Sequence, residues 1–252
     1  MQLELAQIID SAAREARAVS QLSHHQAFTE AEAYQIQAAS IDRRIRRGER
    51  LIGYKLGFTS RAKMAQMGVH DMIWGRLTDA MLYEEGGSLP LDRFIHPRAE
   101  PEIAFRIAKR IEAPIHLLEA SQYVAAVAPA LEIIDSRYER FKFSLEDVIA
   151  DNCSSAGVVL GNWRAADADL DNLGMVLEVD QRPVQVGSSA AILGHPLRCL
   201  VAAARLVTQS GGMIEAGAIL LAGAATAAVY LERGQYVQAR VQDLGRVGIK
   251  VI

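Results

Sequence analysis

Cysteine is scarce in this sequence. Cys153 and Cys199 are the only two among its 252 residues, and they lie far apart in the chain. Their number and separation match neither a disulfide framework nor the paired-cysteine spacing of a zinc site. The sequence therefore gives no basis for a disulfide-stabilised scaffold or a cysteine-ligated metal.

An excess of charge of one sign is also absent. Lysine and arginine number 27 and aspartate and glutamate number 30, which leaves a formal net charge of -3. A balance so close to neutral gives no electrostatic reason to expect nucleic acid or an anionic membrane as a partner.

Long apolar runs are missing as well. The chain nowhere carries the roughly eighteen consecutive apolar residues that a membrane-spanning helix needs. Residues 1–15 include acidic side chains and lack the long apolar core of a secretory signal. We expect a cytoplasmic protein with no membrane partner.

The composition that is present suits a folded core, because 50% of the residues are hydrophobic and 23% are charged. A chain of this length forms one large domain, or a main domain with a small helical appendage. Residues 3–19 are rich in alanine and leucine, and Thr29-Glu30-Ala31-Glu32 has the pattern of a capping box that opens a second helix. One face of that helix is predicted to carry Tyr34, Ala38, Ile41 and Ile45. We predict a helical region over residues 1–50 and a catalytic, strand-rich region over residues 51–252.

Short strands replace helices after Gly48, and the predicted fold class is therefore α+β. The expected elements are a strand at 51–58, a short capped helix at 59–68, a loop at 69–77, a strand at 99–105, an alanine-rich helix at about 116–127, a strand around Glu132, a hairpin of 175–179 with 183–186, a buried helix at 196–209 and a central apolar strand within 218–230. In the loop, the apolar side chains of Ile73 and Trp74 are placed to line a pocket.

Two carboxylates two residues apart, Glu100 and Glu102, stand inside the apolar run 99–105. In a strand both side chains lie on the same face and close together. They could share a proton, but a divalent cation that prefers oxygen ligands is the commoner remedy for their repulsion. Glu132 is the candidate third ligand, because a charge in so apolar a strand is costly unless it is paired. The alternative is a solvated edge strand for the first two residues and an arginine partner for Glu132.

Lys55 occupies the middle of the predicted strand 51–58. Taken alone, a lysine in that position more often extends its ammonium group to solvent than serves in a site. Ser154 belongs to a group of small polar residues before a buried strand, usually a plain helix-to-strand loop, although such residues also present hydroxyl and N–H groups to anions.

Four ordered segments carry a resemblance to a known family. They are Tyr54-Lys55-Leu56-Gly57-Phe58-Thr59-Ser60, Ala99-Glu100-Pro101-Glu102-Ile103-Ala104-Phe105, Leu131-Glu132-Ile133-Ile134-Asp135-Ser136-Arg137-Tyr138 and Ala150-Asp151-Asn152-Cys153-Ser154-Ser155. Together they resemble the hydratase/decarboxylase branch of the fumarylacetoacetate hydrolase superfamily, over residues 51–252 and more weakly through the N-terminal region.

The resemblance implies a mixed β-roll of the fumarylacetoacetate hydrolase C-terminal type, built around one divalent ion, Mg²⁺ or Mn²⁺. The three carboxylate ligands of the family fall on Glu100, Glu102 and Glu132, the same residues that the sequence itself suggests. The family's active-site lysine falls on Lys55 and a pocket serine falls on Ser154. For these residues the resemblance therefore favours the functional interpretation.

Two activities share this scaffold within the family. One decarboxylates the 2-oxo dicarboxylate 2-oxohex-3-enedioate to 2-hydroxypenta-2,4-dienoate, and the other hydrates that dienoate; both belong to the meta-cleavage degradation of aromatic compounds. Hydratases of this branch place an aspartate where this sequence has Ile73, whereas Asp71 stands two positions earlier. Segments 63–69, 141–143 and 193–197 are similar to the decarboxylase version. We therefore expect the decarboxylase activity, with Ile73 and Trp74 supplying a poorly hydrated wall.

Two alternatives stay open at this point. One is the dienoate hydratase, and the other is a catalytically idle family member that serves as the structural partner of a hydratase. Retention of the three glutamates and of Lys55 argues against the idle member. The family also suggests a homo-oligomer and a complex with the companion hydratase, because the dienol product is unstable in water.

Overall fold

The computed structural model describes residues 2–60, 64–65, 69 and 71–252, and it confirms the predicted α+β class. The α-helices among these residues are α1 (Gln2–Glu15), α2 (Glu30–Arg46), α4 (Leu145–Ala150) and α5 (Pro196–Gln209). The strands among them are β1 (Leu51–Gly57), β2 (Ile73–Thr78), β3 (Leu82–Tyr83), β4 (Ser88–Leu89), β5 (Arg98–Ile107), β6 (Val124–Ile134), β7 (Ser155–Leu160), β8 (Arg164–Ala165), β9 (Gly174–Val179), β10 (Arg182–Ser188), β11 (Ile219–Leu221), β12 (Val229–Tyr230), β13 (Tyr236–Val241) and β14 (Gly245–Val251).

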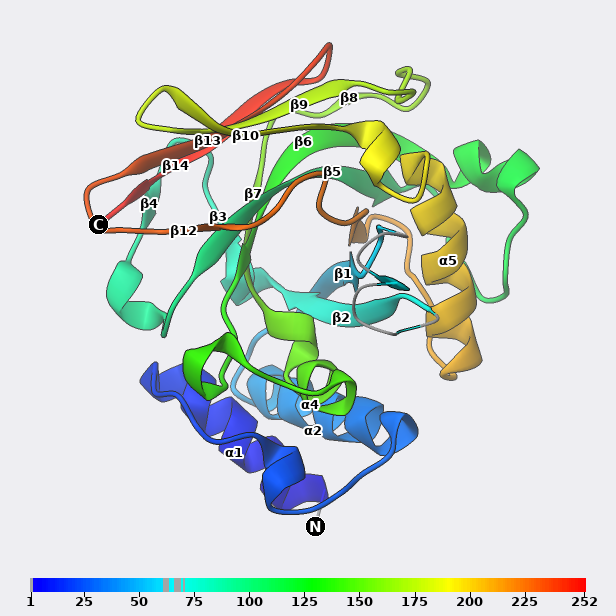
Figure 1. Cartoon of the computed structure of the whole chain (residues 1–252). Coiled ribbons are helices and arrows are strands. Elements are labelled where there is room, and N and C mark those ends of the chain that lie inside the picture. Colours follow the sequence, from blue (N-terminus) through cyan, green and yellow to red (C-terminus); the bar gives the residue numbers. More distant parts are fainter. Residues whose placement is uncertain (1, 61–63, 66–68, 70) are drawn as a thin grey trace.

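The larger sheet carries its strands in the order β2-β1-β11-β5-β6-β7-β3, with β12 paired to β5 and β8 paired to β6. β1 runs parallel to β11 and antiparallel to β2, so the sheet is mixed. In Figure 1 the long strands β5 and β6 arch over the middle of the molecule, with β1 and β2 beneath them. The space enclosed by this curvature is where the chemistry-bearing side chains of β1, β5 and β6 meet.

The smaller sheet, in the order β10-β9-β13-β14-β4, packs on the outer face of the larger one. Leu131 and Ile133 of β6 join Val237 and Ile249 of this second sheet in one apolar cluster. Side chains alternate along a strand, so Glu132, between those two, points to the opposite face. The second sheet thereby fixes which way the charged residue faces.

The predicted capping box opens α2. The Thr29 hydroxyl accepts from the Glu32 N–H, and the Glu32 carboxylate accepts from the Thr29 N–H. The predicted face of Tyr34, Ala38, Ile41 and Ile45 is not buried along its whole length, because Ile45 is exposed. The buried side chains of α2 are instead Ala33, Ile36, Gln37, Ser40 and Ile41. Two of these are polar, and an apolar period alone does not find them.

The N-terminal helices share one apolar cluster with the body of the molecule. Leu5 and Ile9 of α1 and Ile36 of α2 pack with Ile73 of β2 and Ile149 of α4. The predicted division of the chain at residue 50 therefore crosses a continuous core, and it stays a prediction.

α5 was predicted at its observed bounds, and it packs against the larger sheet. Its residues Cys199, Leu200 and Ala203 join Ile103 and Phe105 of β5 in the largest apolar cluster. The helical stretch Ser189–Gln209, taken by length and apolar composition alone, is also sufficient to cross a membrane. Its buried face in this cluster is that of a core helix.

Two predicted elements are wrong. Residues 69–77 were expected as a loop, but Ile73–Thr78 is a strand, because its alternating side chains pair with β1. The expected helix at 116–127 is a 3-10 segment, Leu117–Tyr123, followed at once by β6. Alanine favours a helix in isolation, but a buried place in the middle of a sheet overrides that preference.

The other element predictions have mixed outcomes. The hairpin is confirmed as β9 and β10. Of the apolar stretch 218–230, the segment Ile219–Leu221 forms a central strand between β1 and β5. The short helix expected at 59–68 lies mostly outside the described residues.

Candidate metal centre

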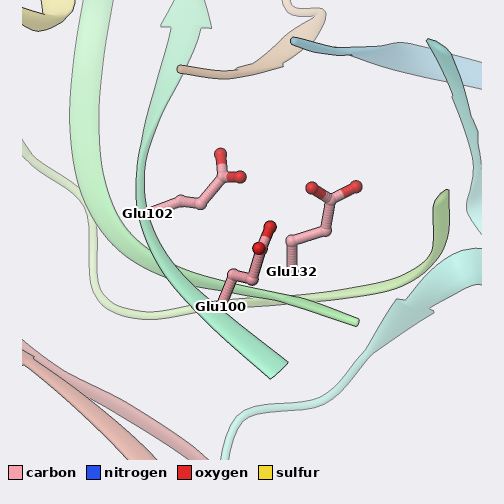
Figure 2. Close-up of side chains that lie close together, drawn as sticks. All are labelled: Glu100, Glu102 and Glu132. Atoms are coloured by element: carbon pink, nitrogen blue, oxygen red, sulfur yellow. The ribbon is translucent and has the colours of Figure 1, made fainter. Parts of the chain in front are cut away.

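Three glutamates converge inside the curved sheet. Glu100 and Glu102 lie on the same face of β5, and Glu132 of β6 is the cross-strand partner of Glu100. One oxygen of each carboxylate lies within 4.8 Å of the others. Figure 2 shows the three carboxylates turned toward one another. The two-residue spacing places Glu100 beside Glu102, and the register between β5 and β6 places Glu132 opposite Glu100.

The cluster is deeply buried. Glu102 and Glu132 are 0% exposed and Glu100 is 9% exposed. Burial, together with the neighbouring charge of Glu132, raises the pKa of Glu102 well above its ordinary value. Lys55 and the Gly223 N–H, which donates to Glu102 Oε2 at 2.7 Å, oppose that rise. The alternative of a solvated edge strand is therefore excluded.

Two carboxylate oxygens in this cluster lack a protein donor. Glu102 Oε1 and Glu132 Oε1 are buried and have no hydrogen-bond partner among the described residues. A buried carboxylate oxygen without a partner is costly. Three carboxylates that converge from one side suit a hard divalent cation as that partner. The residues present therefore fit a divalent metal ion.

Lys55 is the nearest cation to the cluster. Its Nζ lies 3.0 Å from Glu132 Oε2, and it donates to the Cys153 carbonyl oxygen at 3.2 Å. Burial of Lys55 opposes its charged form, but the three glutamates outweigh that effect and hold its pKa above the ordinary value. The carboxylates thus favour the protonated form of Lys55, and the interpretation that its ammonium group reaches solvent is wrong.

The turn before β7 places Ser154 beside Lys55. Asn152, Cys153 and Ser154 all have positive φ angles of 50° to 59°, a left-handed conformation that residues with side chains seldom adopt. The Asn152 side chain holds this turn, because its Oδ1 accepts from the Arg76 N–H at 2.7 Å and its Nδ2 donates to the Arg76 carbonyl at 2.8 Å. Ser154 Oγ is buried and has no partner among the described residues.

A cavity of about 130 Å³ opens beside Lys55 and Glu100. Ile73 and Ser154 line it, as predicted. Trp74 is not part of its lining and instead stacks on Tyr34 and packs edge-on to Tyr54. Neighbouring residues of a strand face opposite ways, so β2 turns Ile73 toward the cavity and Trp74 into the core. The prediction that Trp74 lines the pocket is therefore not supported by the structure.

Several lining residues escaped the sequence interpretation. Phe58, Phe141, Phe143 and Val148 also border the cavity. Segment 141–143 had carried only a similarity to the decarboxylase version, without a role. The Gly223 N–H had no sequence signal, because every residue except proline carries one. A larger hollow of about 1040 Å³ on the smaller sheet shares no lining residue with this site.

His195, Asp135 and Arg137 take structural places. His195 caps α5, where its Nδ1 accepts from the Leu197 N–H at 3.1 Å. Asp135 accepts from the backbone N–H groups of Ile95 and His96. Arg137 forms a buried ion pair with Asp151.

Comparison with known proteins identifies the family. The family model described as fumarylacetoacetate hydrolase C-terminal matches residues 57–252. The chain belongs to the fumarylacetoacetate hydrolase family. Within this family, a Pseudomonas sp protein named 4-oxalocrotonate decarboxylase is 57% identical over 241 residues, covering 96% of this chain and 94% of that protein.

Other members of the fumarylacetoacetate hydrolase family agree with this assignment. A 2-keto-4-pentenoate hydratase of Paraburkholderia xenovorans strain LB400 is 36% identical, covering 86% of this chain and 81% of that protein. A solved structure, 4-oxalocrotonate decarboxylase from Pseudomonas putida G7 complexed with magnesium and adipate, superposes with a TM-score of 0.96 at 36% identity. The superposition covers 100% of this chain and 97% of the solved chain. The predicted fold family is therefore confirmed.

Proposed function

We propose that this chain is a divalent-metal-dependent decarboxylase that converts 2-oxohex-3-enedioate to 2-hydroxypenta-2,4-dienoate and carbon dioxide. The observation that carries the proposal is the buried convergence of Glu100, Glu102 and Glu132 beside a protonated Lys55. The identity of 57% to a protein named 4-oxalocrotonate decarboxylase supports it, since the hydratase compared above is 36% identical.

Glu100, Glu102 and Glu132 would hold the ion, with Mg²⁺ or Mn²⁺ as the candidates. Magnesium is the ion in the related solved structure. When bound, a hard dication supplies Lewis-acid character toward the carboxylate and 2-oxo oxygens of a 2-oxo acid. Three protein carboxylates leave positions of an octahedral ion open to those substrate oxygens.

Lys55 contributes a fixed positive charge where the substrate becomes negative. As the C5–C6 bond breaks, its electrons form the C4–C5 double bond, the C3–C4 double bond shifts to C2–C3, and charge collects on the C2 oxygen. A buried, protonated ammonium group stabilises such charge and can deliver a proton to it. Its bonds to Glu132 and to the Cys153 carbonyl hold Nζ in place for that role.

Ser154 and Ile73 complete the proposed site. The Ser154 hydroxyl, buried without a partner among the described residues, is available to donate to a substrate oxygen in the cavity. Ile73 offers an apolar surface to the other end of the substrate. A poorly hydrated wall favours loss of a carboxylate as neutral carbon dioxide.

Hydration of the dienoate is the second candidate, and Asp71 bears on it. Hydration needs an acid or base at the distal carbons, for which isoleucine has no proton to give. Asp71 is about half exposed, forms an ion pair with Arg205 and is not part of the cavity lining. The described lining therefore supports decarboxylation over hydration, and its intact set of charges opposes an idle structural role.

We further propose a cytoplasmic location, a homo-oligomeric state and a complex with a companion dienoate hydratase. A small 2-oxo dicarboxylate is the expected substrate partner. The chain is similar both to relatives named as decarboxylases and to relatives named as hydratases, the two activities that such a complex would join.

One assay separates these functions. The purified protein with Mg²⁺ is given 2-oxohex-3-enedioate and, separately, 2-hydroxypenta-2,4-dienoate, and carbon dioxide release and dienoate loss are recorded. We expect carbon dioxide from the first substrate and no consumption of the second. Consumption of dienoate without carbon dioxide release would assign the hydratase, and inactivity toward both would assign the idle partner.

A further inference from the structure

The segment between β6 and α4 is held in an unusual backbone conformation at the cavity wall. Arg140 and Phe141 have successive positive φ angles of 59° and 58°. Two such residues in a row, neither of them glycine, persist only where their surroundings hold them. Phe141 and Phe143 of this segment both line the cavity, so the conformation determines where that wall stands.

Arg98 contacts the Phe141 ring, which also packs against His96 and Phe143. Its guanidinium carbon lies 4.0 Å from the centre of the Phe141 ring and 4.1 Å from the centre of the Tyr230 ring. A guanidinium NH2 group also donates to the Tyr230 hydroxyl, whereas Arg98 Nε is buried without a partner among the described residues. The cation thus lies against two rings, and the attraction between a guanidinium and an aromatic face orders both.

The same strand carries the metal-binding face. Arg98 stands two residues before Glu100 on that face of β5, about 7 Å along the strand and on the side away from Glu102. The ring that Arg98 holds therefore bounds the cavity at the side remote from Glu102. A substrate whose 2-oxo acid end lies at the glutamates extends its other end toward this wall.

The cavity is small enough for the wall to select among substrates. Its volume of about 130 Å³ is close to the roughly 150 Å³ of an apolar cavity that holds one benzene molecule. One further methylene would have to displace the Phe141 ring, against which the Arg98 guanidinium packs.

We propose that Phe141 and Phe143 form the wall that sets the length of dicarboxylate the cavity accepts, and that Arg98 is the positioning residue that holds this wall. The proposal rests on the proposed function for its substrate class. Arg98 acts through Phe141 and not on the substrate, because the cavity lining does not include it.

The test measures binding and not turnover. Calorimetry in the presence of Mg²⁺ compares adipate, with six carbons, and pimelate, with seven, for the wild type, Phe141→Leu, Arg98→Met and Arg98→Lys. Phe94→Leu is the matched phenylalanine control, since Phe94 packs in the cluster between the sheets. Arg106→Met is the matched arginine control, since Arg106 lies on β5 over the Trp163 ring.

We expect the wild type to bind adipate about tenfold or more tightly than pimelate, because one methylene in a hydrophobic pocket is worth roughly that factor. Phe141→Leu and Arg98→Met should reduce this ratio to about threefold or less, and Arg98→Lys should restore part of it. Both controls should keep the wild-type ratio. A merely structural role would weaken the binding of both diacids equally and leave the ratio unchanged.

Three results would overturn the proposal. They are an equal affinity of the wild type for both diacids, an unchanged ratio in Phe141→Leu, and a loss of adipate binding in Arg98→Met with pyruvate binding intact. The last result would make Arg98 a direct carboxylate ligand. Failure of the proposed function is seen separately, as absence of carbon dioxide release by the wild type, and it leaves the measured length selectivity standing.

Discussion

Glu132 shows how a single residue acquires its role from its neighbours. Leu131 and Ile133 are buried against the second sheet, so the only side of β6 left for Glu132 is the one that faces Glu100 and Glu102. Three buried carboxylates and one ammonium group then form a cluster with an excess of negative charge. Such a cluster gains stability when a dication binds to it.

Glu102→Gln tests that linkage at the residue most affected by burial. The amide keeps an acceptor for the Gly223 N–H but loses the charge, so the variant should fold and should lose Mg²⁺ binding. At a free Mg²⁺ concentration near 100 times Kd, we expect the free energy of unfolding of the wild type to rise by about 2.7 kcal/mol. This increase should vanish in the variant. Differential scanning calorimetry with and without Mg²⁺ measures both.

Glu178→Gln is the matched control for that substitution. Glu178 is 7% exposed, lies on the smaller sheet and bonds to Gln238 and Arg240. Its variant should keep the full Mg²⁺-dependent stabilisation. An undiminished Mg²⁺ effect in Glu102→Gln would remove this residue from the ligand set.

Lys55→Met separates the lysine's charge from its volume. The methionine fills the space, but Glu132 loses the cation 3.0 Å away. Removing one partner of a buried pair costs about 3–5 kcal/mol, so the metal-free variant should unfold more easily and Mg²⁺ should recover part of the loss. The value of kcat should fall by about 100-fold to 1000-fold, because a preorganised charge is lost.

Chemical denaturation with and without Mg²⁺ and steady-state decarboxylation measure these effects. Lys109→Met is the control, because Lys109 is exposed and lies over the Tyr123 ring. It should change neither quantity. A Lys55→Met variant with wild-type kcat would rule out a catalytic role for the ammonium group.

At the scale of elements, the sequence predicted those whose pattern is local. The capping box at Thr29, the hairpin of β9 and β10 and the spacing of Glu100 and Glu102 are each complete within a few residues. The alanine-rich start of β6 was predicted as a helix because its strand state depends on β5 and β7, which lie far away in sequence. Packing against distant partners is information that a local period lacks.

The candidate site divides in the same way. The glutamates were found from charge in apolar strands, and Lys55 and Ser154 came with the family resemblance. Trp74 was placed at the pocket because its segment was taken for a loop, in which neighbouring side chains have no fixed alternation. Phe141 was not assigned a role, since its place in the wall depends on Arg98 and Tyr230, residues 43 before and 89 after it in the chain.

The turn Asn152–Ser154 bonds to β2 through Asn152 and to Lys55 through the Cys153 carbonyl. Asn152→Ala removes both hydrogen bonds to Arg76 and leaves two backbone groups without partners. We expect a loss of about 2–6 kcal/mol in the free energy of unfolding, since each of the two unsatisfied buried groups costs about 1–3 kcal/mol. The value of kcat should fall too, because the neighbouring Cys153 carbonyl accepts from Lys55.

Urea unfolding and steady-state kinetics measure these losses. Asn172→Ala is the matched control, because Asn172 also has a positive φ, of 49°, but is exposed. It should cost less stability and leave kcat unchanged. Equal stability losses in the two variants would show that the backbone conformation, and not the bonds to Arg76, is what the Asn152 side chain supports.

At the scale of the whole molecule, the larger sheet is supported on two sides. The smaller sheet covers one face through the cluster that contains Leu131 and Val237, and α1 and α2 cover β2 and α4 at one end. Gln37 of α2 is fully buried and donates to the carbonyls of Trp74 and Ile149 at 3.1 Å and 2.8 Å. The N-terminal helices are thus bonded to the same strand that carries Ile73.

The division of the chain at residue 50 can be decided by truncation. A chain of residues 51–252 would expose Ile73, Tyr138 and Ile149, which α1 and α2 now cover. Each such side chain contributes about 1.5–3 kcal/mol when fully buried, and a typical domain has only about 5–15 kcal/mol in total. We therefore expect the truncated chain to show no cooperative thermal transition and no stabilisation by Mg²⁺.

The full chain with Ile36→Ala is the graded counterpart of that truncation. Ile36 is 0% exposed in the same cluster, so the substitution should cost about 2–5 kcal/mol while leaving unfolding cooperative and Mg²⁺-dependent. Calorimetry of both proteins with and without Mg²⁺ makes the comparison. A shared core that loses one side is not expected to keep a cooperative melting transition. If residues 51–252 alone unfolded cooperatively and gained stability from Mg²⁺, the catalytic region would therefore be an independent domain, and the N-terminal helices would be an appendage.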